Sequence, residues 1–100
     1  MSRKVILSKR AEKKLEQLFS YLTENWSEKV KADFVEKLDK IIETIRIQPE
    51  SFQESEQQKG LHRCVITKQT TLFYRFNSKQ IQIVTIFDTR QNPAKLKKDL

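Results

Sequence analysis

The segment SKRAEKKLEQLFSYLTENWSEKVKADFVEKLDKIIETIRIQP, residues 8–49, decides the fold because it carries two amphipathic helices joined by a short break. Apolar residues recur in it at spacings of three and four, which is the repeat of one face of an α-helix. In the first helix, predicted over 9–24, this face comprises Ala11, Leu15, Leu18, Phe19, Leu22 and Trp26. In the second, predicted over about 28–47, it comprises Val30, Phe34, Leu38, Ile41, Ile42 and Ile45.

Local signals mark where each helix begins and ends. Ser8 and Ser27 can cap the two helices, because a serine hydroxyl accepts hydrogen bonds from the free N–H groups of a first turn. Pro49 prevents the second helix from continuing. So short a link makes the helices antiparallel neighbours, since each has to bury its apolar face against something close by. The segment therefore predicts a long antiparallel helical hairpin.

The residues on either side of the hairpin have the character of β-strands. Residues 5–7 form a short β-prone run before it, and the mostly polar residues 48–60 form a loop that ends at Gly60, the only glycine. Three further β-prone segments, separated by polar breaks, span residues 61–67, 70–77 and 80–87. Tight connections between such segments predict an antiparallel meander. The expected fold class is α+β: an N-terminal strand, the helical hairpin and a three-stranded meander.

The middle predicted strand carries apolar side chains on both faces. Leu72, Tyr74 and Phe76 alternate with Phe73. One face of the sheet must pack against the helices. We expect the other to meet either the connections of the first strand or a partner, because an exposed apolar patch on a small protein usually marks a binding surface.

Length and charge limit the possible functions. One hundred residues without a Pro/Gly/Ser-rich linker predict one domain over residues 1–100. The net charge of +7 favours an anionic partner, such as nucleic acid or an acidic protein. A single cysteine and a single histidine predict no disulfide, metal site or cofactor. No apolar run is long enough for a signal peptide or a membrane span, so we expect a cytoplasmic protein.

Motifs in the first half of the chain resemble the RelE/ParE superfamily of bacterial toxins. Residues 8–15, SKRAEKKL, are similar to the opening of the family's first helix, where a Ser and an Ala precede a Leu. Residues 21–26, YLTENW, are similar to the end of that helix.

Motifs in the second half extend the same resemblance. Residues 60–66, GLHRCVI, resemble the family's Gly-Leu-Arg-Arg-Leu-Val strand, and residues 72–76, LFYRF, resemble its Tyr-Arg strand. Residues 86–93, IFDTRQNP, resemble its final strand and Arg-bearing turn. The order and spacing of these motifs, from residue 5 to about 93, identify the chain as a member of the superfamily.

The resemblance implies a toxin of a type II toxin–antitoxin system, neutralised by a cognate antitoxin, and it leaves two activities open. RelE-like members are ribosome-dependent ribonucleases that help a ribose 2′-hydroxyl of mRNA attack the adjacent phosphate. Such a site needs proton-transfer groups and cations. The candidate catalytic residues here are His62, Arg63, Arg75 and Arg90, with Lys68 nearby in sequence. No tyrosine follows Tyr74, however, so the C-terminal tyrosine of the RelE pattern is missing.

ParE-like members instead poison DNA gyrase by binding it and trapping its DNA breaks, and catalyse no reaction themselves. The hairpin of nearly forty residues and the Gly-Leu-x-Arg and Tyr-Arg strands favour this ParE-like activity. Residues Cys64 and Thr71 also stand where RelE members would carry a lysine and an arginine. The expected target-binding residues are Arg63, Lys68, Arg75 and Arg90.

Simpler interpretations exist for each candidate. His62 and Arg63 are also typical of exposed strand ends, Arg75 of a strand residue paired with an acid or stacked on an aromatic ring, and Arg90 of a solvated turn. A third, weaker alternative is a non-catalytic nucleic-acid-binding module, in which the positive charge only neutralises phosphates. Neither a basic recognition helix nor an RNA-recognition aromatic motif supports this alternative.

Overall fold

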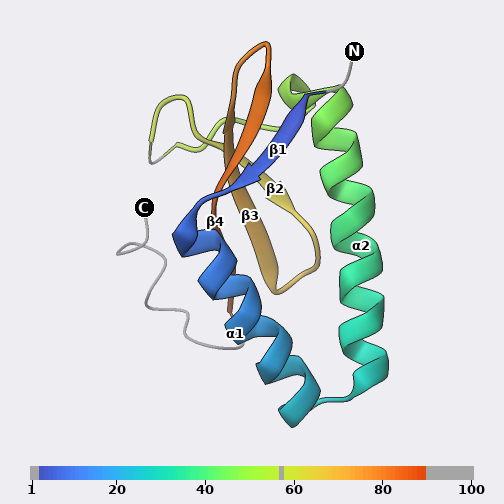
Figure 1. Ribbon diagram of the computed structural model, residues 1–100. Coiled ribbons are helices and arrows are strands. Elements are labelled where there is room, and N and C mark those ends of the chain that lie inside the picture. The colour runs from blue at the N-terminus through green and yellow to red at the C-terminus, as the bar shows by residue number, and fades with distance from the viewer. Residues whose placement is uncertain (1–2, 57, 90–100) are drawn as a thin grey trace.

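The computed structural model describes residues 3–56 and 58–89 (Figure 1). The elements, in chain order, are β1 (Lys4–Leu7), α1 (Lys9–Asn25), α2 (Glu28–Ile47), the 3-10 turn η1 (Pro49–Ser51), β2 (His62–Val65), β3 (Thr70–Phe76) and β4 (Gln80–Asp88). The predicted α+β fold is confirmed, and the predicted helix bounds agree with α1 and α2 to within one residue.

The helices begin where the sequence predicts, because both serine caps form. Ser8 Oγ accepts a hydrogen bond from the Ala11 N–H at 3.0 Å, and Ser27 Oγ accepts one from the Val30 N–H at 3.1 Å. The Ser8 hydroxyl also donates to the Val84 carbonyl at 2.7 Å. The first cap therefore fixes the start of α1 against β4 as well.

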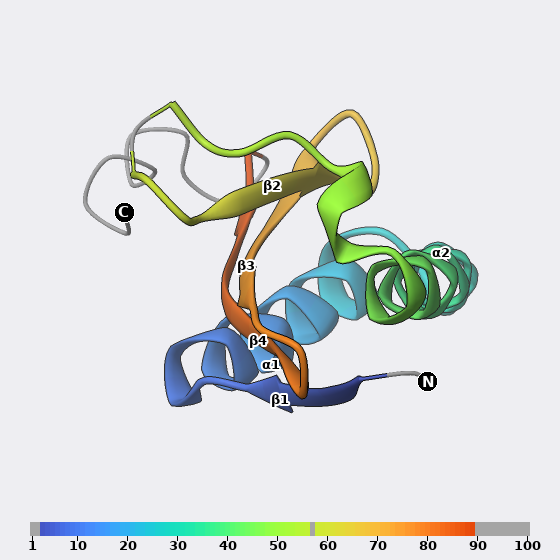
Figure 2. The ribbon, with the colours of Figure 1, turned by 90° about the horizontal axis from the view of Figure 1, so that it is seen from above.

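The four strands form one sheet in the order β1-β4-β3-β2, with β1 and β2 at its two edges (Figure 2). Strands β2, β3 and β4 are the predicted antiparallel meander. Strand β1 pairs in parallel with β4, and Val5 lies opposite Ile81. The chain therefore crosses from one edge of the sheet through the helical hairpin to the other edge.

Strand β2 is shorter than predicted, because residues at both ends of the predicted segment enter turns. The Leu61 N–H donates to the Gln58 carbonyl, and the N–H groups of Ile66 and Thr67 both donate to the Thr70 carbonyl. Before β2, Ser55 N–H donates to the Leu61 carbonyl, so the loop runs along the sheet edge here.

One core joins both helices to one face of the sheet. Figure 1 shows the two helices meeting at their connecting turn and diverging from it. The buried members of the core are Ala11, Leu15, Leu18, Leu22, Phe34, Leu38, Ile45, Cys64, Ile66, Leu72, Tyr74, Ile81, Ile83 and Ile86. Val30, Ile41 and Ile42 are only partly buried. The prediction is wrong for Trp26, whose side chain is 56% exposed, because α1 ends at Asn25 and Trp26 caps it at the hairpin turn.

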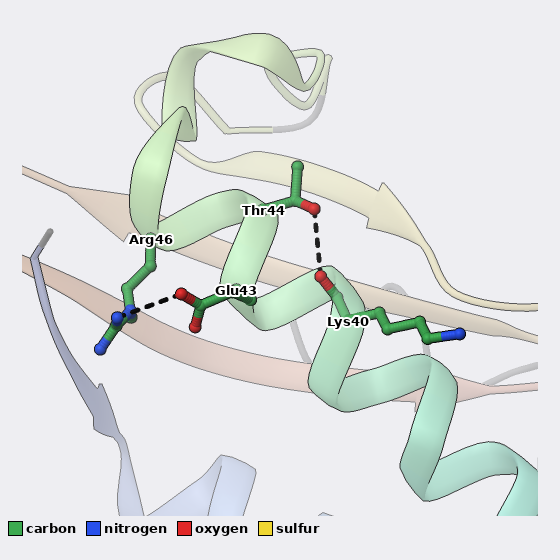
Figure 3. Close-up of polar contacts among 4 residues, drawn as sticks. All are labelled: Lys40, Glu43, Thr44 and Arg46. Carbon is green, nitrogen blue, oxygen red and sulfur yellow. Dashed lines mark hydrogen bonds and ion pairs between the residues drawn. The ribbon is translucent and has the colours of Figure 1, made fainter.

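The outward side of α2 is solvated and nearly balanced in charge. Figure 3 shows Arg46 donating to the Glu43 carboxylate at 3.1 Å and the Thr44 hydroxyl donating to the Lys40 carbonyl at 3.0 Å. Exposed ion pairs of this kind contribute little to stability. The basic excess of the sequence therefore lies outside α2, in residues 1–14 and 59–100.

Within residues 3–56 and 58–89, neither helix is long and apolar enough to cross a membrane.

Candidate functional site

The sheet face turned away from the helices, here called the outer face, carries two of the predicted site residues. Arg63 pairs across the strands with Phe73, and Arg75 pairs with Gln82. Cross-strand partners point to the same face. Phe73 belongs to a buried cluster separate from the main core. Phe73, Arg63 and Arg75 therefore lie on the outer face.

The sequence left open whether this face meets the connections of the first strand or a partner, and in the structure Leu61, from the loop before β2, packs on part of it. Phe73 and Phe87 are buried there together with Leu61, which returns from the loop that precedes β2. The large apolar side chain that stays exposed is Val65, opposite Thr71. The outer face is thus a small apolar cluster bordered by arginines.

Arg75 joins two of the sequence motifs in space. Its Nη1 donates to the Lys59 carbonyl at 3.2 Å. Gly60 follows with a φ of +80°, and a Cβ on Gly60 would lie 3.0 Å from Arg75 Nη1. The Gly60 N–H donates to a Glu54 carboxylate oxygen at 3.0 Å. Arg75 therefore holds the loop before β2, and the loop admits its guanidinium because residue 60 has no side chain.

We expect Gly60→Ala to lower the free energy of unfolding by about 1–2 kcal/mol, because alanine in the left-handed region is strained and its Cβ would displace the Arg75 guanidinium. Urea titration of the purified protein measures this loss. Lys59→Ala is the control, since the carbonyl of residue 59 that Arg75 binds is kept. An unchanged unfolding midpoint for Gly60→Ala would show that this contact is dispensable.

His62 lies on the opposite face from the two arginines. Its ring stacks on Tyr74, with the ring centroids 5.5 Å apart, and packs at a tilt on Phe76 at 5.0 Å. Its Nδ1 atom is buried and has no hydrogen-bond partner among the described residues. Successive strand residues point to opposite faces, so His62 and Arg63 cannot act on one substrate group from the same side.

The Tyr74 hydroxyl and the Cys64 thiol could in principle react, but in this fold both have structural roles. The Tyr74 hydroxyl donates to the Pro49 carbonyl at 2.6 Å, and burial raises the pKa of this hydroxyl far above its usual value. Burial also raises the pKa of the Cys64 thiol to about 11. Both groups stay protonated at neutral pH. Cys64 is therefore a poor nucleophile, and Tyr74 fixes η1 to the sheet.

Lys68 is exposed in the turn between β2 and β3, at the end of the sheet where β4 also finishes. The turn is tied to that end, because the Thr89 N–H donates to the Gln69 carbonyl at 2.8 Å. Arg90 lies outside the described residues and follows Thr89 in the sequence. The described basic candidates are thus spread along the sheet, with Lys68 at one end, and are not gathered in one pocket.

A buried polar pair at this end of the sheet is missing from the sequence-based prediction. Thr70 Oγ1 donates to Asp88 Oδ2 at 2.5 Å, and both side chains are buried. The two residues are eighteen positions apart and pair across β3 and β4. Thr70 begins β3 and Asp88 ends β4, so the contact depends on the register of the two strands, which no local spacing in the sequence reveals.

Comparison with known proteins gives a family and a set of similar folds. A family model described as the ParE toxin of the type II toxin–antitoxin system parDE matches residues 5–93. A chain of the chromosomal ParDE system from P. aeruginosa has a TM-score of 0.71 and 11% identity, covering 87% of this chain and 96% of that one. No curated protein sequence matches.

Two further structures have the same fold. A chain of the E. coli DinJ–YafQ toxin–antitoxin complex has a TM-score of 0.64 and 10% identity, covering 92% of this chain and 98% of that one. The YoeB/ParE toxin from Agrobacterium tumefaciens has a TM-score of 0.62 and 13% identity, covering 85% and 96%. The structures support the fold, the family match confirms the resemblance seen in the sequence, and the chain belongs to the ParE toxin family of type II toxin–antitoxin systems.

Proposed function

We propose that this toxin inhibits DNA gyrase by binding it and stabilising its DNA breaks, and that it catalyses no reaction itself. The observation that carries the proposal is the separation of His62 from Arg63 and Arg75. His62 packs against Tyr74 and Phe76 on the helix side of the sheet. Arg63 and Arg75 belong to the outer face. A ribonuclease needs a proton-transfer group and cations around one phosphate, and the described residues do not bring them together.

The proposed binding surface is the outer face together with the turn that carries Lys68. Arg63 and Lys68 are exposed, and Arg75 is partly exposed while it holds the loop at Lys59. Guanidinium groups bind carboxylates and phosphates through pairs of parallel hydrogen bonds. This surface therefore suits an anionic partner, and we assign Arg63, Lys68, Arg75 and Arg90 to target binding.

The partner that holds the toxin in check is the cognate antitoxin, which type II systems of this family carry. We propose that the antitoxin presents acidic side chains to the basic outer face, because opposite charges speed association and fix orientation. Gyrase and its DNA are cytoplasmic, so we place the toxin in the cytoplasm. We also propose that it acts as one domain.

The first lesion after induction in growing cells tests the proposed activity. We expect chromosomal DNA breaks and the DNA-damage response to appear before any loss of intact mRNA. Co-expression of the antitoxin should suppress both the breaks and the growth arrest. Cleavage of ribosome-bound mRNA while the chromosome stays intact would contradict the proposal and favour the RelE-like ribonuclease.

A further inference from the structure

The Thr70–Asp88 pair buries a carboxylate at the end of the sheet. The Asp88 side chain is 4% exposed and Thr70 is fully buried, and the Thr70 hydroxyl donates to the Asp88 carboxylate. Burying a carboxylate requires hydrogen bonds that compensate for the lost water. Apolar residues of similar volume often stabilise such a position as well or better. Besides any contribution to folding, the pair joins the first residue of β3 to the last residue of β4 through their side chains.

The hydrogen bonds around the pair fix the turn that carries Lys68. Thr70 is the first residue of β3 and Asp88 the last of β4, directly opposite each other in register. On the turn side, Thr67 Oγ1 accepts from the N–H groups of Gln69 and Thr70, each at 3.2 Å. The turn that carries the exposed Lys68 is thereby fixed in shape and held against the end of β4.

We propose that the Thr70–Asp88 pair is a positioning element, which holds the Lys68 turn in the conformation that binds the target. The inference rests on the proposed target-binding role of this surface. A turn that is ordered before binding loses less conformational entropy when the complex forms. The pair would act through Lys68 and would not touch the target itself.

Three single variants separate positioning from general stability. Thr70→Val keeps the shape but removes the hydroxyl, Thr70→Ser keeps the hydroxyl, and Thr85→Val is the matched control. Thr85 is equally buried, and its hydroxyl has no hydrogen-bond partner among the described residues. We expect Thr70→Val to need about tenfold more protein for half-maximal growth inhibition, which corresponds to about 1.4 kcal/mol. Thr70→Ser and Thr85→Val should match the wild type at equal protein levels.

Hydrogen exchange shows whether the turn is the part that changes. In Thr70→Val we expect faster exchange at the Gln69 and Thr89 amides, with unchanged protection in α1 and α2. Full growth inhibition by Thr70→Val despite this loosened turn would overturn the inference. So would Thr70→Ser behaving like Thr70→Val, because the hydroxyl would then not be the relevant group.

A double-mutant cycle with Lys68→Ala, compared at equal levels of folded protein, tests the stated route. If the pair acts through Lys68, the loss in the double variant Lys68→Ala/Thr70→Val should be close to the loss in Lys68→Ala alone. Additive losses, or full activity of Lys68→Ala, would overturn the positioning role. A wild-type chain that inhibits growth without affecting gyrase would contradict only the proposed target. One that does not inhibit growth would contradict the function and this inference together.

Discussion

Replacing Leu38 by alanine is expected to lower the free energy of unfolding by about 2–5 kcal/mol. Leu38 lies on α2 and is 5% exposed, within the core that joins both helices to the sheet. Removing its isobutyl group leaves a cavity that the surrounding side chains fill only in part. Because domains of this size have total stabilities of about 5–15 kcal/mol, we expect a large fall in the urea midpoint or no folded protein.

Two variants on the same helix control for this effect. Ile47 is 57% exposed, so Ile47→Ala should change stability by less than about 0.5 kcal/mol. Ile42 is only partly buried, and Ile42→Ala should fall between the two, although the sequence pattern predicts equal burial of Leu38 and Ile42. Equal thermal midpoints for Leu38→Ala and the wild type would show that α2 packs through a different face.

Arg90→Ala is expected to abolish growth inhibition while leaving the melting curve unchanged. Arg90 lies outside the described residues, and the prediction rests on the motif IFDTRQNP, in which it matches the arginine of the family's closing turn. If the toxin binds gyrase, removing the Arg90 side chain lowers its affinity for gyrase. If the toxin were a ribonuclease, the same change would lower the cleavage rate, because the charge on the phosphate would lose a stabilising cation.

Lys40→Ala is the matched control for Arg90→Ala. Both variants lower the net charge by one, but Lys40 is exposed on α2, where its Nζ lies 3.3 Å from the carboxylate of Glu36, one helical turn away. We expect Lys40→Ala to keep full toxicity. A fully toxic Arg90→Ala variant refutes the assignment, and an Arg90→Ala variant that is inactive because it unfolds gives Arg90 a structural role.

The helices could be predicted from the sequence because their signals are local. Apolar spacing, the serine caps and Pro49 all act within a few residues, and both helices agree with the prediction to within one residue. The parallel pairing of β1 with β4 joins residues about 76 positions apart, and depends on how the hairpin packs between them. Trp26 fits the helical spacing but lies one residue beyond α1, which local spacing does not reveal.

The candidate site could be predicted only in part, because some of its contacts join residues that are far apart in the sequence. The motifs pointed to Arg63 and Arg75, and the alternation of strand residues already implied that His62 and Arg63 point to opposite faces. The contact between Arg75 and the Gly60 turn joins residues fifteen positions apart, and the Thr70–Asp88 pair depends on strand register. No periodicity in the chain encodes either contact.

Purified gyrase provides the most direct test of the proposed activity. Supercoiled plasmid, ATP and gyrase are incubated with increasing amounts of toxin, and DNA is resolved after detergent and protease treatment. Linear DNA from trapped gyrase breaks should accumulate with toxin concentration and disappear when the antitoxin is added first. Unchanged gyrase activity at saturating toxin, with cleavage of ribosome-bound mRNA by the same preparation, would contradict the account.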